Sequence, residues 1–134
     1  MKIKLNKNPT SKFLNKDNLD RFYTKPSVVD KLLKEITLED YDIVVEPAAG
    51  TGNWSFKIED CIAIDKAPEH SDIMKGDFLE DDFLFDEMKK ENRILVIGNP
   101  PFGRIGNKAL KFINKAAEFA DTVAFILPRS FRKE

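Results

Sequence analysis

The segment Asn99-Pro100-Pro101-Phe102 follows an apolar run, residues 94–97, and combines groups that are suited to holding a ligand. Proline can neither donate to a sheet ladder nor continue a helix, so a stiff loop at a strand end is expected. Asn99 and Pro100 offer carbonyl oxygens, and Phe102 offers an aromatic face. The alternative interpretation is a rigid turn with Phe102 docked on the core.

A second candidate segment is residues 44–55, in which the end of another apolar run is followed by two glycines. Gly50 and Gly52 allow the backbone to turn tightly and to approach a ligand closely. A helix expected after them would point free N–H groups at the same place. The spacing is not G-x-G-x-x-G, because Ser55 stands at the last position, and it is not a P-loop pattern. A dinucleotide site and a P-loop nucleotide site are therefore poorly supported.

Acidic side chains stand at the ends of the next two expected strands. Asp65 ends the first of these strands, where a carboxylate can accept hydrogen bonds from ribose hydroxyls. Asp77 ends the second and could accept from an adenine amino group, with Phe78 beside it as a stacking or packing surface. Each aspartate alone could equally cap a helix. Their succession along the chain favours an adenosine-binding site.

These segments lie between helix and strand patterns that alternate along the chain. The apolar runs predict strands at residues 41–46, 61–65, 71–77, 93–98 and 122–127, the third of them weak. Apolar spacing predicts helices over residues 28–36, with Thr24 or Ser27 as the cap, over 80–90, and over 109–120, with Asn107 as the cap. The pattern is that of an open α/β sheet of mostly parallel strands, whose ligands bind beyond the carboxyl ends of the strands.

The composition is that of one globular domain, with 42% hydrophobic and 34% charged residues among 134. The net charge of −1 argues against an autonomous, strongly basic nucleic-acid binder. A single cysteine, Cys61, and a single histidine, His70, argue against a disulfide framework and a zinc site, and no metal is expected. No apolar run approaches a membrane span, and no signal-peptide core follows Met1. The low cysteine content fits a reducing environment, so a cytoplasmic location is expected. Residues 1–20 are interpreted as an N-terminal arm and residues 21–134 as the domain.

Four motifs, E-P-A-A-G-T-G, A-I-D-K-A-P, G-D-F and N-P-P-F, occur in this order. They resemble the motifs of class I S-adenosylmethionine-dependent methyltransferases of the N6-adenine type. Residues 21–33 are similar to the additional cofactor motif of that family, and residues 125–134 to the segment after the fifth strand in related phage and bacterial proteins. The motif order resembles the γ arrangement of DNA adenine methyltransferases. The resemblance covers residues 20–134 and implies a Rossmann-like sheet and methyl transfer to adenine, with DNA favoured over RNA.

The resemblance assigns catalysis to the N-P-P-F segment. The Asn99 side-chain oxygen and the Pro100 carbonyl would hold both hydrogens of the adenine amine and draw its nitrogen towards a tetrahedral geometry. That would free the lone pair to attack the sulfonium methyl group in line. Pro100 and Pro101 would fix the direction of the carbonyl, so that the acceptors are preorganised. Phe102 would stack on the extruded base.

The resemblance also assigns the S-adenosylmethionine site to the other strand ends. Asp65 would bind the ribose, and Asp77 with Phe78 would bind the adenine. The predicted cofactor-binding residues are Tyr23, Thr24, Glu46, Pro47, Ala48, Gly50, Gly52, Asp65, Lys66, Asp77 and Phe78. Two alternatives stay open here: Tyr23 could be an ordinary core aromatic, and Glu46 could orient the glycine loop or meet the sulfonium end.

Basic residues after the N-P-P-F segment allow two interpretations. Arg104, Lys108 and Lys111 could meet substrate phosphates, or they could form a solvated helix face. A non-catalytic module that binds the cofactor or a partner chain is the alternative to an enzyme. Within the enzyme class, protein glutamine and RNA guanine N2 are the other substrates. Phe102 stands where protein-glutamine enzymes typically carry tyrosine, which favours a nucleobase.

The chain departs from the family pattern at its C-terminal end. Family members continue past the fifth strand with two more strands and, in the γ type, with a target-recognition region. The sheet is therefore expected to lack its last two strands. The strand at residues 122–127 would then be an uncovered apolar edge, which natural proteins usually protect. A homodimer through this edge, or a partner that supplies the missing target-recognition region, is expected.

Overall fold

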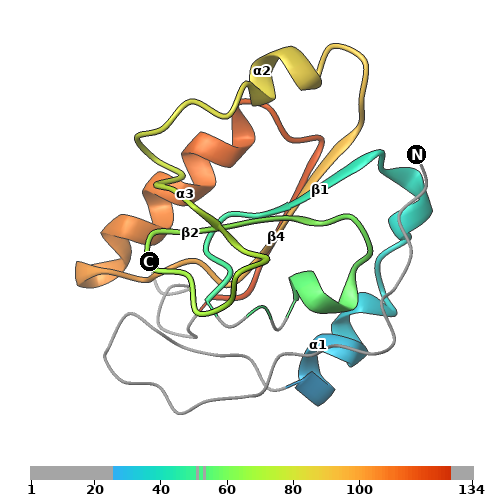
Figure 1. Ribbon diagram of the computed structural model, residues 1–134, viewed down its shortest axis with the longest axis horizontal. Helices are drawn as coiled ribbons and strands as arrows, with labels where there is room; N and C mark the ends of the chain where they lie inside the picture. The colour runs from blue at the N-terminus through green and yellow to red at the C-terminus, as the bar shows by residue number, and fades with distance from the viewer. Residues whose placement is uncertain (1–25, 51, 53, 128–134) are drawn as a thin grey trace.

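The computed structural model describes residues 26–50, 52 and 54–127. Among these residues, five strands form one parallel sheet in the order β3-β2-β1-β4-β5. Figure 1 labels β1, β2 and β4 of this sheet. The strands are β1 (Ile43–Glu46), β2 (Ile62–Asp65), β3 (Met74–Lys75), β4 (Ile94–Gly98) and β5 (Thr122–Phe125). All five predicted strands are present, each shorter than the apolar pattern indicates. The α/β class and the parallel sheet are confirmed.

Within the described residues, three α-helices and three 3-10 turns precede or connect the strands. The helices are α1 (Pro26–Leu33), α2 (Phe85–Met88) and α3 (Asn107–Ala117). The turns are η1 (Leu38–Asp40), η2 (Ser55–Lys57) and η3 (Arg104–Gly106). Of the helix predicted over residues 80–90, only α2 is helical. In the segment before α2, aspartate side chains hold the backbone in turns: Asp82 Oδ1 accepts a hydrogen bond from the Leu84 N–H at 2.8 Å.

Two predicted helix caps are wrong. α1 already begins at Pro26, where the missing proline N–H costs nothing, so Ser27 lies inside the first turn. Thr24, the other proposed cap, lies outside the described residues. Asn107 is the first residue of α3, and the cap position is Gly106, whose φ of 79° is left-handed.

The helix predicted directly after the glycine loop is also wrong. In its place the described chain has η2, a single turn that ends when Ile58 returns to an extended conformation. The chain must reach the start of β2 at Ile62, which leaves room for one turn only. The side chain of Phe56, within this turn, is buried.

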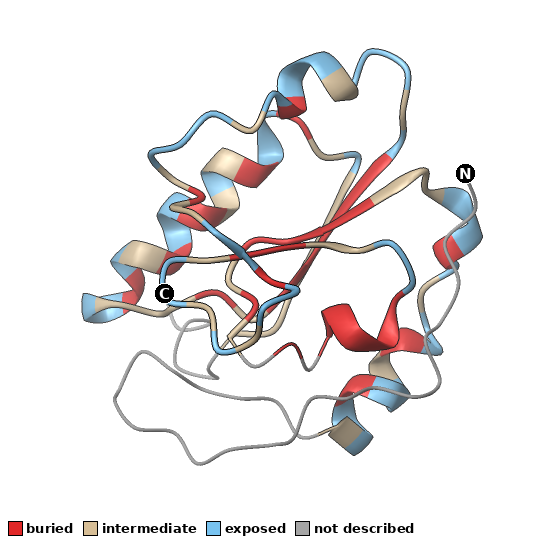
Figure 2. Cartoon of the chain, viewed as in Figure 1, coloured by how far each residue is buried: buried red, intermediate tan, exposed pale blue. Residues whose placement is uncertain are grey.

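The sheet has a hydrophobic core on each face. On one face, Val44 and Leu95 pack with residues of α1 and η1 and with Trp54 and Ile58, which flank η2. On the other, Val45 and neighbouring strand residues pack with aromatic side chains from α2, α3 and the adjoining loops. Successive strand residues face opposite ways, so both faces are covered, and Figure 2 shows β1 and β4 buried between the layers. This double burial explains the continuous apolar run of β4.

β5 forms one edge of the sheet as far as the structure describes it. Its side chains are half-buried, and the Tyr41 hydroxyl donates to Thr122 Oγ1 at 2.6 Å. Self-association through this edge and the absence of two further strands stay predictions. The arm predicted over residues 1–20 lies outside the described residues. None of the helices within the described ranges is long and apolar enough to span a membrane.

Candidate ligand site at the carboxyl ends of the strands

The strand order reverses at β1, which pairs with β2 on one side and with β4 on the other. In open α/β sheets, ligands bind beyond the carboxyl ends of the strands at such a point. Glu46 ends β1 and Gly98 ends β4, and a Cβ on Gly98 would lie 3.0 Å from the Glu46 Cγ. Gly98 also has a φ of 138°, which favours glycine. The glycine loop and the Asn99 loop therefore begin side by side.

Glu46 is a buried acid at this point, with 2% of its surface exposed. Burial raises the pKa of Glu46 well above its usual value, the Asp65 charge adds to the rise, and hydrogen bonding from Ser55 opposes it. The Ser55 N–H donates to Glu46 Oε1 at 3.0 Å. Glu46 thus connects the end of β1 to η2 across the glycine loop, a contact that fits the loop-orienting alternative. Pro47 beside it is buried.

Both glycines of the loop have left-handed backbones, with φ of 59° at Gly50 and 91° at Gly52. A Cβ on Gly52 would lie 2.8 Å from the ring of Phe56, closer than real Cβ contacts. The Gly52 N–H donates to the Ala49 carbonyl at 2.8 Å, which closes the turn. Glycine is therefore required at position 52, both because the backbone is left-handed and because the Phe56 ring leaves no space for a Cβ. Ala48, earlier in the loop, is half-buried.

Asp65 joins the glycine loop to the loop after β2. Its Oδ2 accepts from the Gly50 N–H at 2.8 Å, and its Oδ1 accepts from the Ala67 N–H at 2.8 Å. The side chain is half-buried at the carboxyl end of β2. A carboxylate is thus fixed beside the glycine loop, as the strand-end argument predicted. Two backbone N–H donors orient it.

Asp77 and Lys66 lie together at the ends of β3 and β2. The Asp77 Oδ1 accepts from the Leu79 N–H at 3.0 Å, and the Asp77 N–H donates to Asp81 Oδ2 at 2.8 Å. The Lys66 Nζ lies 4.0 Å from Asp77 Oδ2, with the lysine exposed. Asp77 thus bonds the backbone of a local turn and does not cap the next helix, α2, which begins at Phe85. It lies at the same carboxyl edge of the sheet as Asp65.

Phe78 does not have the position predicted for a stacking surface. Its side chain is 1% exposed and belongs to the core under α3. The ring stacks on Phe112 with centroids 5.4 Å apart and meets the Phe119 ring edge-on at 6.0 Å. The packing alternative describes this residue, because the phenylalanines of this core enclose it. Phe78 is therefore a core residue and is not part of the candidate site.

The N-P-P-F segment forms the loop between β4 and η3. The Ile126 N–H donates to the Gly98 carbonyl at 2.9 Å, which fixes the start of the loop against the chain after β5. Pro100 is buried, and Asn99, Pro101 and Phe102 are half-buried. The Phe102 carbonyl accepts from the Ala109 N–H at 3.2 Å, which fixes the end of the loop on α3. The loop is thus supported at both ends, as a stiff strand-end loop should be.

Two predicted cofactor residues, Tyr23 and Thr24, lie outside the described residues. Among the described residues, no cluster of histidine, cysteine and acidic side chains could hold a metal ion. The single free cysteine, Cys61, is partly buried, and desolvation raises its pKa well above the usual value. Neither observation adds a reactive group to the candidate site.

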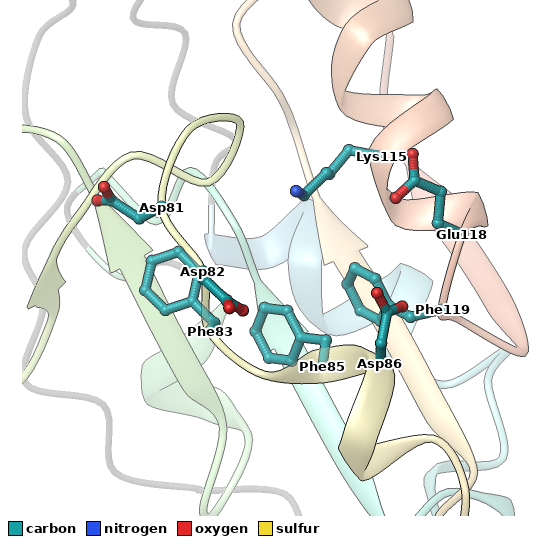
Figure 3. Close-up of a pocket in the computed structure, with 8 residues that line it drawn as sticks. All are labelled: Asp81, Asp82, Phe83, Phe85, Asp86, Lys115, Glu118 and Phe119. Carbon is teal, nitrogen blue, oxygen red and sulfur yellow. The ribbon is translucent and has the colours of Figure 1, made fainter.

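A small hollow lies elsewhere, between the last turn of α3 and the loop before α2 (Figure 3). Its floor consists of aromatic rings, with Phe85 and Phe119 stacked at 4.5 Å between centroids. Acidic side chains and Lys115 surround it. The space is about 30 Å³, too small for a nucleoside, and none of the predicted site residues lines it.

The sequence interpretation missed the backbone of the segment after Phe102. Ile105 has φ 45° and ψ 36°, a left-handed conformation inside η3. The signal available in the sequence was the isolated Ile105 between Gly103 and Gly106, which the helical pattern obscured. This segment leads directly from the Asn99 loop into α3.

No protein-family model, curated protein or solved structure matches this chain. The glycine loop, Asp65 and the Asn99 loop converge on the carboxyl ends of β1, β2 and β4. They combine a carboxylate, tight backbone turns and an amide next to rigid prolines.

Proposed function

We propose that this chain binds S-adenosylmethionine and transfers its methyl group to the N6 amine of adenine in nucleic acid, with DNA as the favoured substrate. The observation that carries the proposal is the contact between the two motif-bearing strand ends, where Gly98 packs against Glu46. This contact supports a cofactor loop and a catalytic loop that begin at one place. Methyl transfer requires that proximity.

The residues around the glycine loop fit the proposed cofactor. Asp65 offers carboxylate oxygens to ribose hydroxyls, and the hydrogen bond from the Gly50 N–H keeps it beside the loop. Gly52, with a left-handed backbone packed on the Phe56 ring, keeps the loop tightly turned beside Asp65, where the methionine portion would lie. Asp77 remains the proposed acceptor for the adenine amine. When bound, S-adenosylmethionine supplies an electrophilic methyl group.

The Asn99 loop would hold the amine that receives the methyl group. The Asn99 side-chain oxygen and the Pro100 carbonyl accept its two hydrogens, which withdraws the nitrogen lone pair from the ring. Because Pro100 is buried and the loop is bonded at both ends, the carbonyl is fixed before the substrate arrives. Phe102 supplies the stacking face, and the surplus proton leaves to water.

The proposal is tested by methyl transfer from labelled S-adenosylmethionine to unmethylated DNA, RNA and protein pools, assayed side by side. Label in adenine N6 of DNA is the expected result. Asn99→Ala should lower turnover by about a hundredfold or more, because it removes an acceptor used mainly in the transition state. Asn114→Ala, which changes an exposed asparagine on α3, is the matched control and should stay active.

Calorimetry with S-adenosylhomocysteine accompanies the transfer assay. Asn99→Ala should bind it as tightly as the unmodified chain, which separates catalysis from cofactor binding. Binding without transfer to any pool would favour the non-catalytic module. Label in protein glutamine or in RNA guanine would show that this class of molecule, and not DNA adenine, is the substrate. Neither binding nor transfer by folded protein would overturn the proposal.

A further inference from the structure

Ile105 is the most exposed of the large apolar side chains that the structure describes, with 97% of its surface accessible. Its φ of 45° and ψ of 36° lie in the left-handed region. That conformation is a genuine outlier for a β-branched residue. No buried contact of the Ile105 side chain compensates for it. Strain of this kind persists where surrounding structure imposes it, and it occurs preferentially at functional sites.

Glycine turns on both sides impose this conformation. Gly103 and Gly106 have φ of 73° and 79°, so the chain reverses before and after Ile105. Gly103 packs directly on α3, since a Cβ there would lie 2.5 Å from the Cβ of Lys108. Together with the bond from the Ala109 N–H to the Phe102 carbonyl, this contact holds the segment against the first turn of α3. Ile105 therefore projects from a fixed base.

Three of the eight residues from 104 to 111 are basic. Arg104 adjoins Ile105 and is exposed, Lys108 lies in the first turn of α3, and Lys111 is exposed one turn later. The first turn of α3 contains no acidic residue. None of the ion pairs formed within the described residues includes any of these cations. A chain of net charge −1 thus concentrates cations next to the Asn99 loop.

We propose that residues 104–111 form a DNA-contacting tip, in which Ile105 inserts between base pairs beside the extruded adenine and the three cations bind phosphates. Proteins that distort DNA insert single apolar side chains between base steps, and cations on either side position them. Extrusion of a base leaves a gap in the stack, which an apolar side chain can fill. An exposed isoleucine with cations before and after it along the chain suits this partner better than an apolar protein surface. The inference rests on the proposed function and gives the substrate as duplex DNA.

The test measures affinity by fluorescence anisotropy, with the whole chain and two labelled DNA duplexes of the same sequence. One duplex is intact, and in the other a single adenosine is replaced by an abasic analogue. The unmodified chain should bind the abasic duplex about fivefold or more tightly, because Ile105 can enter the gap left by the missing base without any base being unstacked. Ile105→Asn should abolish that preference and weaken binding to the intact duplex by about tenfold. Asparagine tolerates the left-handed backbone, so the fold should be kept.

Leu84→Asn is the matched control, because Leu84 is also apolar, exposed at 58% and left-handed, with φ of 62°, but lies at α2. It should keep both affinities and the preference. The double variant Arg104→Gln with Lys111→Gln should lower the affinity for both duplexes by the same factor. The dependence of its affinity on salt concentration should fall by the amount expected for the loss of about two phosphate contacts. The role of these cations is thereby distinguished from that of Ile105, because only the change at Ile105 should alter the preference for the abasic duplex.

An unchanged preference and affinity in Ile105→Asn would overturn the inference, even if the chain methylates DNA normally. Equal losses in Ile105→Asn and Leu84→Asn would overturn it as well, as would binding of neither duplex by the unmodified chain. A preference for the abasic duplex that depends on Ile105, in a chain that transfers no methyl group, would support the inference while the proposed function fails.

Discussion

Replacement of Ile105 by asparagine should stabilise the fold. The left-handed backbone at Ile105 costs roughly 1–2 kcal/mol for a residue of this type, and asparagine recovers about half of that cost. Because the isoleucine is 97% exposed, the exchange sacrifices almost no buried apolar surface. The expected gain in the free energy of unfolding is therefore about 0.5–1 kcal/mol. For a chain of this size it corresponds to a rise in Tm of about 2–4 °C.

Thermal and urea unfolding, followed by circular dichroism, measure this gain directly. Leu84→Asn also relieves a left-handed backbone, but Leu84 is only partly exposed, so its gain should be smaller. A lower Tm for Ile105→Asn than for the unmodified chain would refute the reasoning, since it would mean that the side chain contributes contacts to the fold. A higher Tm with weaker DNA binding would show that strain at Ile105 is retained for function.

Three further perturbations test the site. Asp65→Ala should weaken S-adenosylhomocysteine binding at least about tenfold by calorimetry, whereas a variant with unchanged affinity would exclude Asp65 from the ribose site. Gly52→Ala should lower the free energy of unfolding by about 2–4 kcal/mol in urea, because its Cβ would lie 2.8 Å from the Phe56 ring and its φ is 91°. Burial raises the pKa of Glu46, so as pH rises above its usual value of 4.5 the unfolded chain loses this proton first. The free energy of unfolding should therefore fall with rising pH until the pKa of Glu46 in the folded chain is passed. The fall is at most about tenfold in the folding equilibrium constant per pH unit. Glu46→Gln should flatten this part of the pH profile of unfolding.

The sequence identified the strands and the residues at their ends, because both features are local. A run such as residues 94–97 is apolar at every position, which is typical of a strand buried on both faces. The prolines after Asn99 exclude helix and sheet on steric grounds alone. The positions of Asp65 and Asn99 at carboxyl ends of strands followed from these elements without tertiary information.

The errors in the sequence interpretation arose where distant parts of the chain compete for one residue. Phe78 has the sequence context of a ligand contact, but the rings of Phe112 and Phe119, far along the chain, enclose it. The helix expected after Gly52 is limited to η2 because β2 must pair beside β1. Propensity in a short segment cannot anticipate such constraints.

The sequence by itself thus determined the α/β class, the strand ends and the stiff loop at Asn99, since hydrophobic period and proline geometry act on neighbouring residues. Only the tertiary structure decided which strand ends meet. The strand order places β4 beside β1, so that Gly98 packs on Glu46 although half the described chain separates them. It also decided that Ile105 is exposed in a strained backbone, because that conformation depends on the packing of Gly103 against α3.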